Sequence, residues 1–165
     1  MADAWDGTLE EWVTSEGHCS AAGMAQVTDG AFYAAAPVAN DQGWGAIYKE
    51  DHAEDILQDD GVTTKKVTIN EGWQLKLLMD TGKTPAGGVW FAGEKYTVPQ
   101  TDLKFEMGEN TFGWAFAARP KKGVHIVSTG NQIVAGFYSE EKGQNTGNCK
   151  KTVLAFAEYL KGIGY

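Results

Sequence analysis

Apolar residues recur at helical spacing at both ends of the chain. Near the start, one helical face carries Trp5, Leu9, Trp12 and Val13. We expect Asp3 to cap this helix, Gly17 to end it, and Trp12 to be buried in the core with its neighbours. Near the end, a helix that begins around Asn148 and stops at Gly162 carries a stripe of Val153, Phe156, Ala157 and Leu160. Each apolar face must pack on another layer of the fold.

Between these helices the pattern changes to the period of two that is typical of β-strands. The predicted strands comprise residues 31–36, 88–98 (a hairpin that turns near Gly93), 112–116, 124–127 and 133–138. The last three follow one another through short turns, and short connections join antiparallel neighbours. The second half of the chain is therefore predicted to be a β-meander.

The stretch from residue 40 to residue 84 is less regular. It contains a short predicted helix at residues 44–49, an acidic run at residues 50–60, and a second predicted helix at residues 71–79. Strands enclosed by terminal helices favour an α+β fold in which helices cover an antiparallel sheet. We expect a single domain of residues 1–165, with an acidic loop and β-hairpin extension at about residues 51–69.

The bulk composition is that of a folded globular protein. The 165 residues include 42% hydrophobic and 22% charged side chains, which suits one hydrophobic core. The net charge of −8 disfavours binding to nucleic acid or to anionic membranes in general. No run approaches the roughly 20 apolar residues that span a bilayer, and the first residues lack a signal segment. We therefore expect a cytoplasmic protein.

Residues that often carry catalysis or bind metal ions form no known motif in this chain. The two cysteines, Cys19 and Cys149, lack the CxxC spacing of a zinc site, and we expect both thiols to be reduced. Close metal-ligand spacing is also absent from the histidines, which are His18, His52 and His125. The acidic run lacks the ligand pattern of an EF-hand loop. The sequence thus predicts no enzyme activity, no metal and no cofactor.

Aromatic residues gather near the two ends of the chain. Trp5 belongs to the first helix, Tyr33 to the first strand, and Tyr159 lies off the centre of the last helix's apolar stripe. Tyr165 is the last residue and follows two glycines, where a ring without a role would fray. If the terminal helices pack side by side, these rings form one shallow surface. A row of amphipathic rings is what a polyproline II helix requires.

The order and spacing of several segments resemble the profilin family, and within it the apicomplexan branch. The segments are the opening helix around Trp5, residues 29–36 (DGAFYAAA), 88–96 (GVWFAGEKY), 138–142 (YSEEK), 147–148 (GN) and 155–160 (AFAEYL). The resemblance covers essentially the whole chain. It implies a central antiparallel sheet with the terminal helices on one face and shorter helices on the other, and a non-enzymatic role.

The resemblance also implies two binding surfaces, one for monomeric actin and one for proline-rich segments of formin-type proteins. By position, the proline-binding rings fall on Trp5, Tyr33, Tyr159 and Tyr165, whereas Thr8 replaces a further ring found in other profilins. The actin-facing surface falls on Lys95, Arg119, Lys121, Lys122, Gly123, Gly147, Lys150 and Lys151. An acidic chain approaches acidic actin best through a locally basic face of this kind.

Two alternatives remain open from the sequence. Gln100 stands where the family usually carries a basic residue, which favours an adaptor that binds proline-rich peptides or, weakly, phosphoinositides, with little affinity for actin. A small hydrolase that uses adjacent His18 and Cys19, or the carboxylate cluster of the acidic run, is the other alternative, and it rests on sequence adjacency alone.

Overall fold

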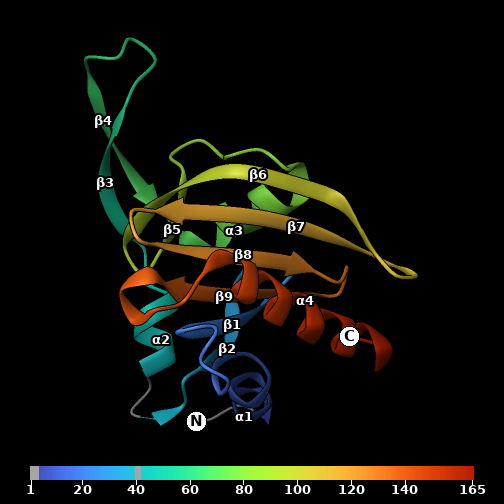
Figure 1. The fold of residues 1–165 in the computed structure, drawn as a ribbon. Helices are drawn as coiled ribbons and strands as arrows, with labels where there is room; N and C mark the ends of the chain where they lie inside the picture. Colours follow the sequence, from blue (N-terminus) through green and yellow to red (C-terminus); the bar gives the residue numbers. More distant parts are fainter. Residues whose placement is uncertain (1–3, 40–41) are drawn as a thin grey trace.

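Seven antiparallel strands form the central sheet of the protein (Figure 1). The computed structural model describes residues 4–39 and 42–165. The strand order is β2-β1-β9-β8-β7-β6-β5. The strands are β1 (Ala21–Gln26), β2 (Phe32–Ala36), β5 (Val89–Phe91), β6 (Glu94–Met107), β7 (Asn110–Arg119), β8 (Lys122–Ser128) and β9 (Gln132–Ser139). Strands β6 to β9 pair in sequence order, so the predicted meander is confirmed.

Helices cover both faces of this sheet, as predicted. On one face, α1 (Ala4–Leu9) continues into a π-helical segment, η1 (Glu10–Thr14), and packs beside α4 (Thr146–Gly162). On the other face lie α2 (Gln42–Ile47) and α3 (Glu71–Thr81). A 3-10 turn, η3 (Glu140–Lys142), precedes α4. The α+β fold class is therefore confirmed.

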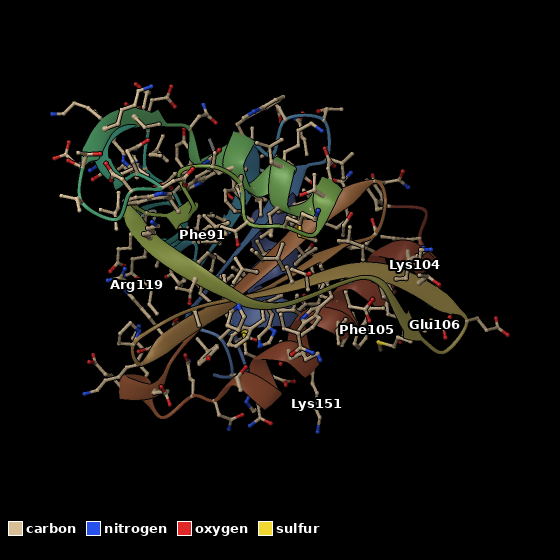
Figure 2. The ribbon with its side chains drawn as sticks, turned by 90° about the horizontal axis from the view of Figure 1, so that it is seen from above. Phe91, Lys104, Phe105, Glu106, Arg119 and Lys151 are labelled. Atoms are coloured by element: carbon tan, nitrogen blue, oxygen red, sulfur yellow. The ribbon has the colours of Figure 1, made fainter. Side chains whose placement is uncertain are left out.

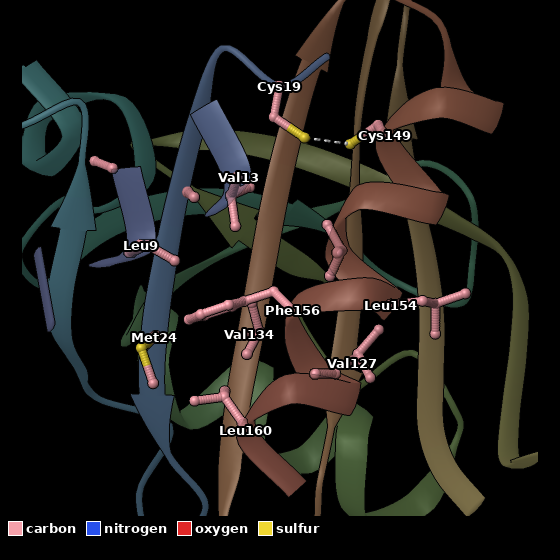
Figure 3. Packing of buried hydrophobic residues seen from close by; sticks show 14 of the residues in the cluster. Leu9, Val13, Cys19, Met24, Val127, Val134, Cys149, Leu154, Phe156 and Leu160 are labelled. Atoms are coloured by element: carbon pink, nitrogen blue, oxygen red, sulfur yellow. Dashed lines mark hydrogen bonds between the residues drawn. The ribbon is translucent and has the colours of Figure 1, made fainter. Parts of the chain in front are cut away.

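The sheet separates two hydrophobic cores. The core under the terminal helices contains the fully buried Leu9, Val13, Phe156 and Leu160 (Figure 3). The core under α2 and α3 contains Ile47, Leu75 and Leu78. The predicted stripe of α4 is buried throughout, but the helix begins at Thr146, before the predicted start at Asn148. Asn145 caps it by accepting from the Asn148 N–H at 2.9 Å, and the predicted cap Asp3 lies outside the described residues.

Strand β6 is longer than the sequence pattern predicted. The predicted hairpin ended at Val98, whereas β6 continues through Pro99 to Met107. Pairing with β7 shifts register between Thr97 and Gln100, so the ladder passes Pro99, which has no N–H to donate. A second shift follows between Asp102 and Phe105. Bulges of this kind interrupt the alternation of side chains that identifies a strand in a sequence.

A separate two-stranded hairpin projects from the body (Figure 1). Its strands are β3 (His52–Leu57) and β4 (Thr64–Ile69), so much of the acidic run lies in a strand and not in a loop. The base of the hairpin belongs to the body, because Ile69 is buried and His52 contacts the buried Glu71. The peripheral part is therefore shorter than the predicted residues 51–69.

Replacing residues 55–66 with a short Gly/Ser link is expected to lower the free energy of unfolding by less than about 1 kcal/mol. Asp55 and Lys66 are paired neighbours, so a short link closes the gap at little entropic cost. A longer replacement that starts at Asp51 should lower the free energy of unfolding by more, because it also removes His52 and its contact with Glu71. Urea unfolding of both variants measures the difference. Loss of cooperative unfolding in the shorter variant would show that the hairpin is part of the core.

Candidate functional site

The first helix and the last residue bring two predicted rings together. Trp5 and Tyr165 pack edge to face, with ring centroids 4.9 Å apart. Tyr165 is held in place, since its N–H donates to the Leu160 carbonyl at 2.8 Å and its own carbonyl accepts from Thr129 Oγ1 at 2.7 Å. A terminal ring fixed in this way retains little conformational freedom to lose on binding a ligand.

Tyr33 and the first helix are positioned by hydrogen bonds. The Tyr33 hydroxyl donates to Gln132 Oε1 on β9. The buried carboxylate of Asp6 accepts from the Ala35 N–H at 3.1 Å, which holds α1 against β2. Tyr33 and Trp5 are both half-buried and both pack against the core under the terminal helices.

Tyr159 pairs with Trp12, a residue predicted from the sequence to be buried in the core. Trp12 stacks on Tyr159 with ring centroids 4.6 Å apart, and the two side chains are 38% and 36% exposed. The prediction that Trp12 is buried was therefore wrong. Trp12 lies in the π-helical segment η1, whose wider turn rotates side chains away from the positions expected at 3.6 residues per turn. Trp12 and Tyr159 thus form a second pair of rings, one from η1 and one from α4.

The start of α4 carries three of the predicted actin-facing residues. The ammonium of Lys150 lies 4.0 Å from the centroid of the Trp114 ring and 4.9 Å from that of Phe105, a cation–π arrangement that orients it. Lys151 is exposed and projects from the outer side of α4 (Figure 2). Gly147 is also exposed.

The remaining predicted residues gather at the β7–β8 turn and the start of β6. Arg119 packs over Tyr96 of the opposite core, and its guanidinium donates to the Lys95 carbonyl at 2.6 Å. Both Arg119 and Lys122 form ion pairs with Glu94. The structure therefore separates Arg119 and Lys122, which point to the α2 and α3 side, from Lys150, which belongs to α4 on the other face of the sheet. The other members of this group are Lys121 in the turn, exposed Lys95 and buried Gly123.

A buried histidine connects the sheet to the start of α4. His125 Nδ1 accepts from Trp114 Nε1 at 3.2 Å, and Nε2 lies 2.7 Å from Thr146 Oγ1, so the neutral ring donates from Nε2. Its ring stacks on Phe116 with centroids 4.8 Å apart. Burial, together with the nearby charge of Lys150, lowers the pKa of His125 to about 4.

The low pKa of His125 predicts a loss of stability in mild acid. The unfolded chain binds a proton at this residue near pH 6.5 and the folded chain only near pH 4. The contribution of neutral His125 to the free energy of unfolding is complete above pH 6.5. It falls by about 3 kcal/mol as the pH is lowered to 4. When urea unfolding is measured between pH 7 and 4, the free energy of unfolding of His125→Gln should decrease less with falling pH than that of the wild type. His18→Gln is the control. If the free energy of unfolding decreases equally in the wild type and in His125→Gln, protonation of His125 is not the cause of the loss.

The structure gives no support to the hydrolase alternative. The Cys19 thiol is buried and contacts Cys149, whereas His18 lines a cavity between η1 and α4 beside Trp12 and Lys151. In residues 4–39 and 42–165, no group of three or more acidic, histidine or cysteine side chains is arranged to hold a metal ion. Within the same ranges, every helix is too short or too polar to span a membrane.

Comparison of the sequence with known proteins identifies relatives along its full length. The family model described as Profilin matches residues 3–165. A profilin of Plasmodium falciparum (isolate 3D7) is 33% identical over 163 residues, which cover 95% of this chain and 94% of that protein. A profilin of Plasmodium berghei is 34% identical, with 95% of this chain and 92% of that protein covered.

Solved structures of lower identity show the same fold. Acanthamoeba castellanii profilin II is 18% identical, with a TM-score of 0.67 over 98% of this chain and all of that chain. Mouse profilin IIa in complex with a double repeat from the FH1 domain of mDia1 is 13% identical, with a TM-score of 0.57 over 99% and 100%. The match along residues 3–165 and the Plasmodium relatives confirm the resemblance: the chain belongs to the profilin family of non-enzymatic actin-binding proteins, as an apicomplexan-type member.

Proposed function

We propose that the protein binds monomeric actin and regulates its polymerisation in the cytoplasm, and that it holds proline-rich segments of formin-type proteins on a second surface. The observation that carries the proposal is the family match along residues 3–165, combined with a sheet and helices in the expected arrangement. A binding role needs side chains held in place at the surface, not a reactive group.

The actin surface is proposed to centre on the start of α4 and the adjoining strands. Lys150 and Lys151 add positive charge there to a chain whose net charge is −8. The rings of Trp114 and Phe105 orient the ammonium of Lys150, so less side-chain entropy is lost when it meets an acidic partner. Arg119 and Lys122 are expected to contribute less, because they lie on the α2 and α3 side and Glu94 neutralises part of their charge.

The proline-binding surface is proposed to comprise Trp5, Tyr33, Tyr159 and Tyr165, together with Trp12. A polyproline II helix has fixed backbone angles and no internal hydrogen bonds, so it packs on rings and accepts hydrogen bonds through its carbonyls. Tyrosine hydroxyls and indole N–H groups are suitable donors. The FH1 repeat bound to the mouse relative is a partner of that protein, and it indicates the ligand class to test here.

Titration of tryptophan fluorescence with a polyproline peptide tests this second surface. We expect saturable binding with a Kd on the order of micromolar to millimolar, because Thr8 replaces one family ring. Deletion of Tyr165, or Trp12→Ala, should raise Kd about tenfold, which corresponds to ~1.4 kcal/mol.

Trp73→Ala is the matched control for the fluorescence titration. Trp73 is 49% exposed but lies on α3, on the opposite side of the sheet, so its removal should leave Kd unchanged. Absence of a saturable signal in the wild type would refute the surface itself. An unchanged Kd without Tyr165 would exclude that ring from it.

One observation favours a second candidate function, an adaptor for proline-rich peptides or phosphoinositides with weak actin affinity. Glu94 engages both Arg119 and Lys122, and Gln100 on β6 carries no charge. Direct titration of monomeric actin separates the two candidates, since the adaptor would bind the polyproline peptide but not actin.

A further inference from the structure

Two cysteines that are far apart in the sequence meet under the terminal helices. Cys19 immediately precedes β1, and Cys149 lies in the first turn of α4. Their sulfur atoms are 3.2 Å apart, and the side chains are 2% and 0% exposed (Figure 3). These are the only cysteines among the 165 residues, so their chemistry can be followed without interference.

The close approach depends on a glycine in β9. A Cβ atom at Gly136 would lie 2.3 Å from Val153 Cγ2 and 3.4 Å from Cys19 Sγ. A larger residue would therefore push α4 away from the sheet. Gly136 also accepts a hydrogen bond from the Cys149 thiol at 3.3 Å through its carbonyl oxygen. The backbone of β9 thus fixes the position of Cys149.

A chain of two hydrogen bonds links the thiols to β9. The Cys19 thiol donates to Cys149 Sγ, and the Cys149 thiol donates to the Gly136 carbonyl. The hydrogen bond with Cys19 and burial both raise the pKa of Cys149 above its ordinary value. Both cysteines are free in the structure, so the pair is available for oxidation.

Cys19 is the member of the pair that a small reagent reaches first. It lines an open cavity of about 460 Å³ whose other walls come from the first helical segment, Ser20 and Pro37. Cys149 lies behind Cys19 and does not line this cavity. An oxidant that enters therefore meets Cys19, with Cys149 in place to react with the product.

We propose that Cys19 and Cys149 are a redox modification site, at which a hydroperoxide-class oxidant converts the dithiol into a reversible intramolecular disulfide. The sulfur atoms need to approach by only about 1 Å from 3.2 Å to reach bonding distance. Reduction by a small dithiol restores the two thiols.

The reaction proceeds in two balanced steps. The sulfur of Cys19 attacks one peroxide oxygen, the O–O bond breaks, and the departing hydroxide takes up the proton that Cys19 loses, which gives a sulfenic acid and water. The sulfur of Cys149 then attacks the Cys19 sulfur, the S–O bond breaks, and the hydroxyl leaves as water with the proton of Cys149. Two thiols lose two electrons and two protons, and one hydrogen peroxide becomes two waters.

The disulfide would join the segment before β1 to the first turn of α4. A bond that closes so long a loop restricts the unfolded chain and stabilises the folded one. We therefore expect oxidation to raise the Tm by at least about 5 °C. It would also fix the part of α4 that carries Lys150 and Lys151.

Treatment of the full chain with a small excess of hydrogen peroxide, followed by intact-mass measurement and thiol titration, tests the proposal. We expect a mass loss of about 2 Da, loss of both titratable thiols, a monomeric product, and full reversal by dithiothreitol. Digestion should yield one peptide pair linked through Cys19 and Cys149. The Tm of the oxidised protein provides a second readout on the same sample.

Cys19→Ser and Cys149→Ser are matched controls, because each leaves one thiol. Neither should lose 2 Da, and the remaining thiol should instead add oxygen in steps of about 16 Da. Two thiols still titratable in the treated wild type would overturn the proposal. So would oxygen addition without a cross-link in the wild type, or a disulfide that joins two chains.

Discussion

Replacing Glu71 by alanine is expected to lower the free energy of unfolding by about 3–5 kcal/mol. The Glu71 side chain is 1% exposed, and its carboxylate accepts from the N–H groups of Lys49, Ala92 and Gly93 at 2.7–3.0 Å. His52 Nε2 lies 2.9 Å from the same carboxylate. Alanine would leave these partly buried donors without their acceptor, and each orphaned group costs about 1–3 kcal/mol.

Glu54→Ala is the matched control for Glu71→Ala. Glu54 faces the other ring nitrogen of His52 at 2.6 Å, but its side chain is 30% exposed, so water can replace its contact. Its removal should cost less than about 1 kcal/mol. Urea unfolding at neutral pH measures both variants. If Glu71→Ala lowers the free energy of unfolding no more than Glu54→Ala does, the Glu71 carboxylate does not stabilise the contact between the end of α2, the hairpin and the β5–β6 turn.

Reversing the two lysines at the start of α4, Lys150→Glu with Lys151→Glu, is expected to weaken actin binding by about tenfold to a hundredfold, or ~1–3 kcal/mol. The change replaces two positive charges of the proposed actin surface with two negative ones, which acidic actin would repel. Arg119 is a poorer target, because its guanidinium also holds the Lys95 carbonyl and Glu94, so reversal would disturb the sheet.

Lys65→Glu with Lys66→Glu is the matched control for this reversal. These two residues are exposed on β4, carry the same charge, and lie on the hairpin that projects away from α4. The control changes the net charge by the same amount, so a difference in actin affinity between the two double variants depends on where the charges lie. Titration of monomeric actin measures both variants. Equal affinities in both double variants would place the actin surface elsewhere.

Sequence periodicity predicted elements whose side chains alternate or recur regularly. The stripe of α4 from Val153 to Leu160 is buried as predicted, because a long α-helix keeps 3.6 residues per turn. The alternation of Phe112 and Trp114 likewise identified β7. Rings near the chain ends were found by composition, and the structure brings Trp5 and Tyr165 into contact.

Features that depend on local departures from regular geometry were not predictable in this way. The π-helical segment turned Trp12 outward onto Tyr159, although a regular helix would bury it beside Val13. The bulges around Pro99 concealed the length of β6.

Tertiary contacts between distant residues also left no local signal. Nothing in the sequence near Cys19 or Cys149 indicates that the two thiols are in contact, because the residues are 130 positions apart. The pairing of Arg119 and Lys122 with Glu94 is equally invisible from sequence, because it depends on the register of β6, β7 and β8.

Polymerisation of pyrene-labelled actin in the presence of increasing amounts of the protein shows whether it binds actin monomers. If the protein binds monomers, it should slow spontaneous polymerisation in a concentration-dependent manner, and the Lys150→Glu, Lys151→Glu variant should require a higher concentration for the same effect. Fluorescence traces that remain identical to those of actin alone, even at a large excess of the wild-type protein, would show that it does not bind actin monomers.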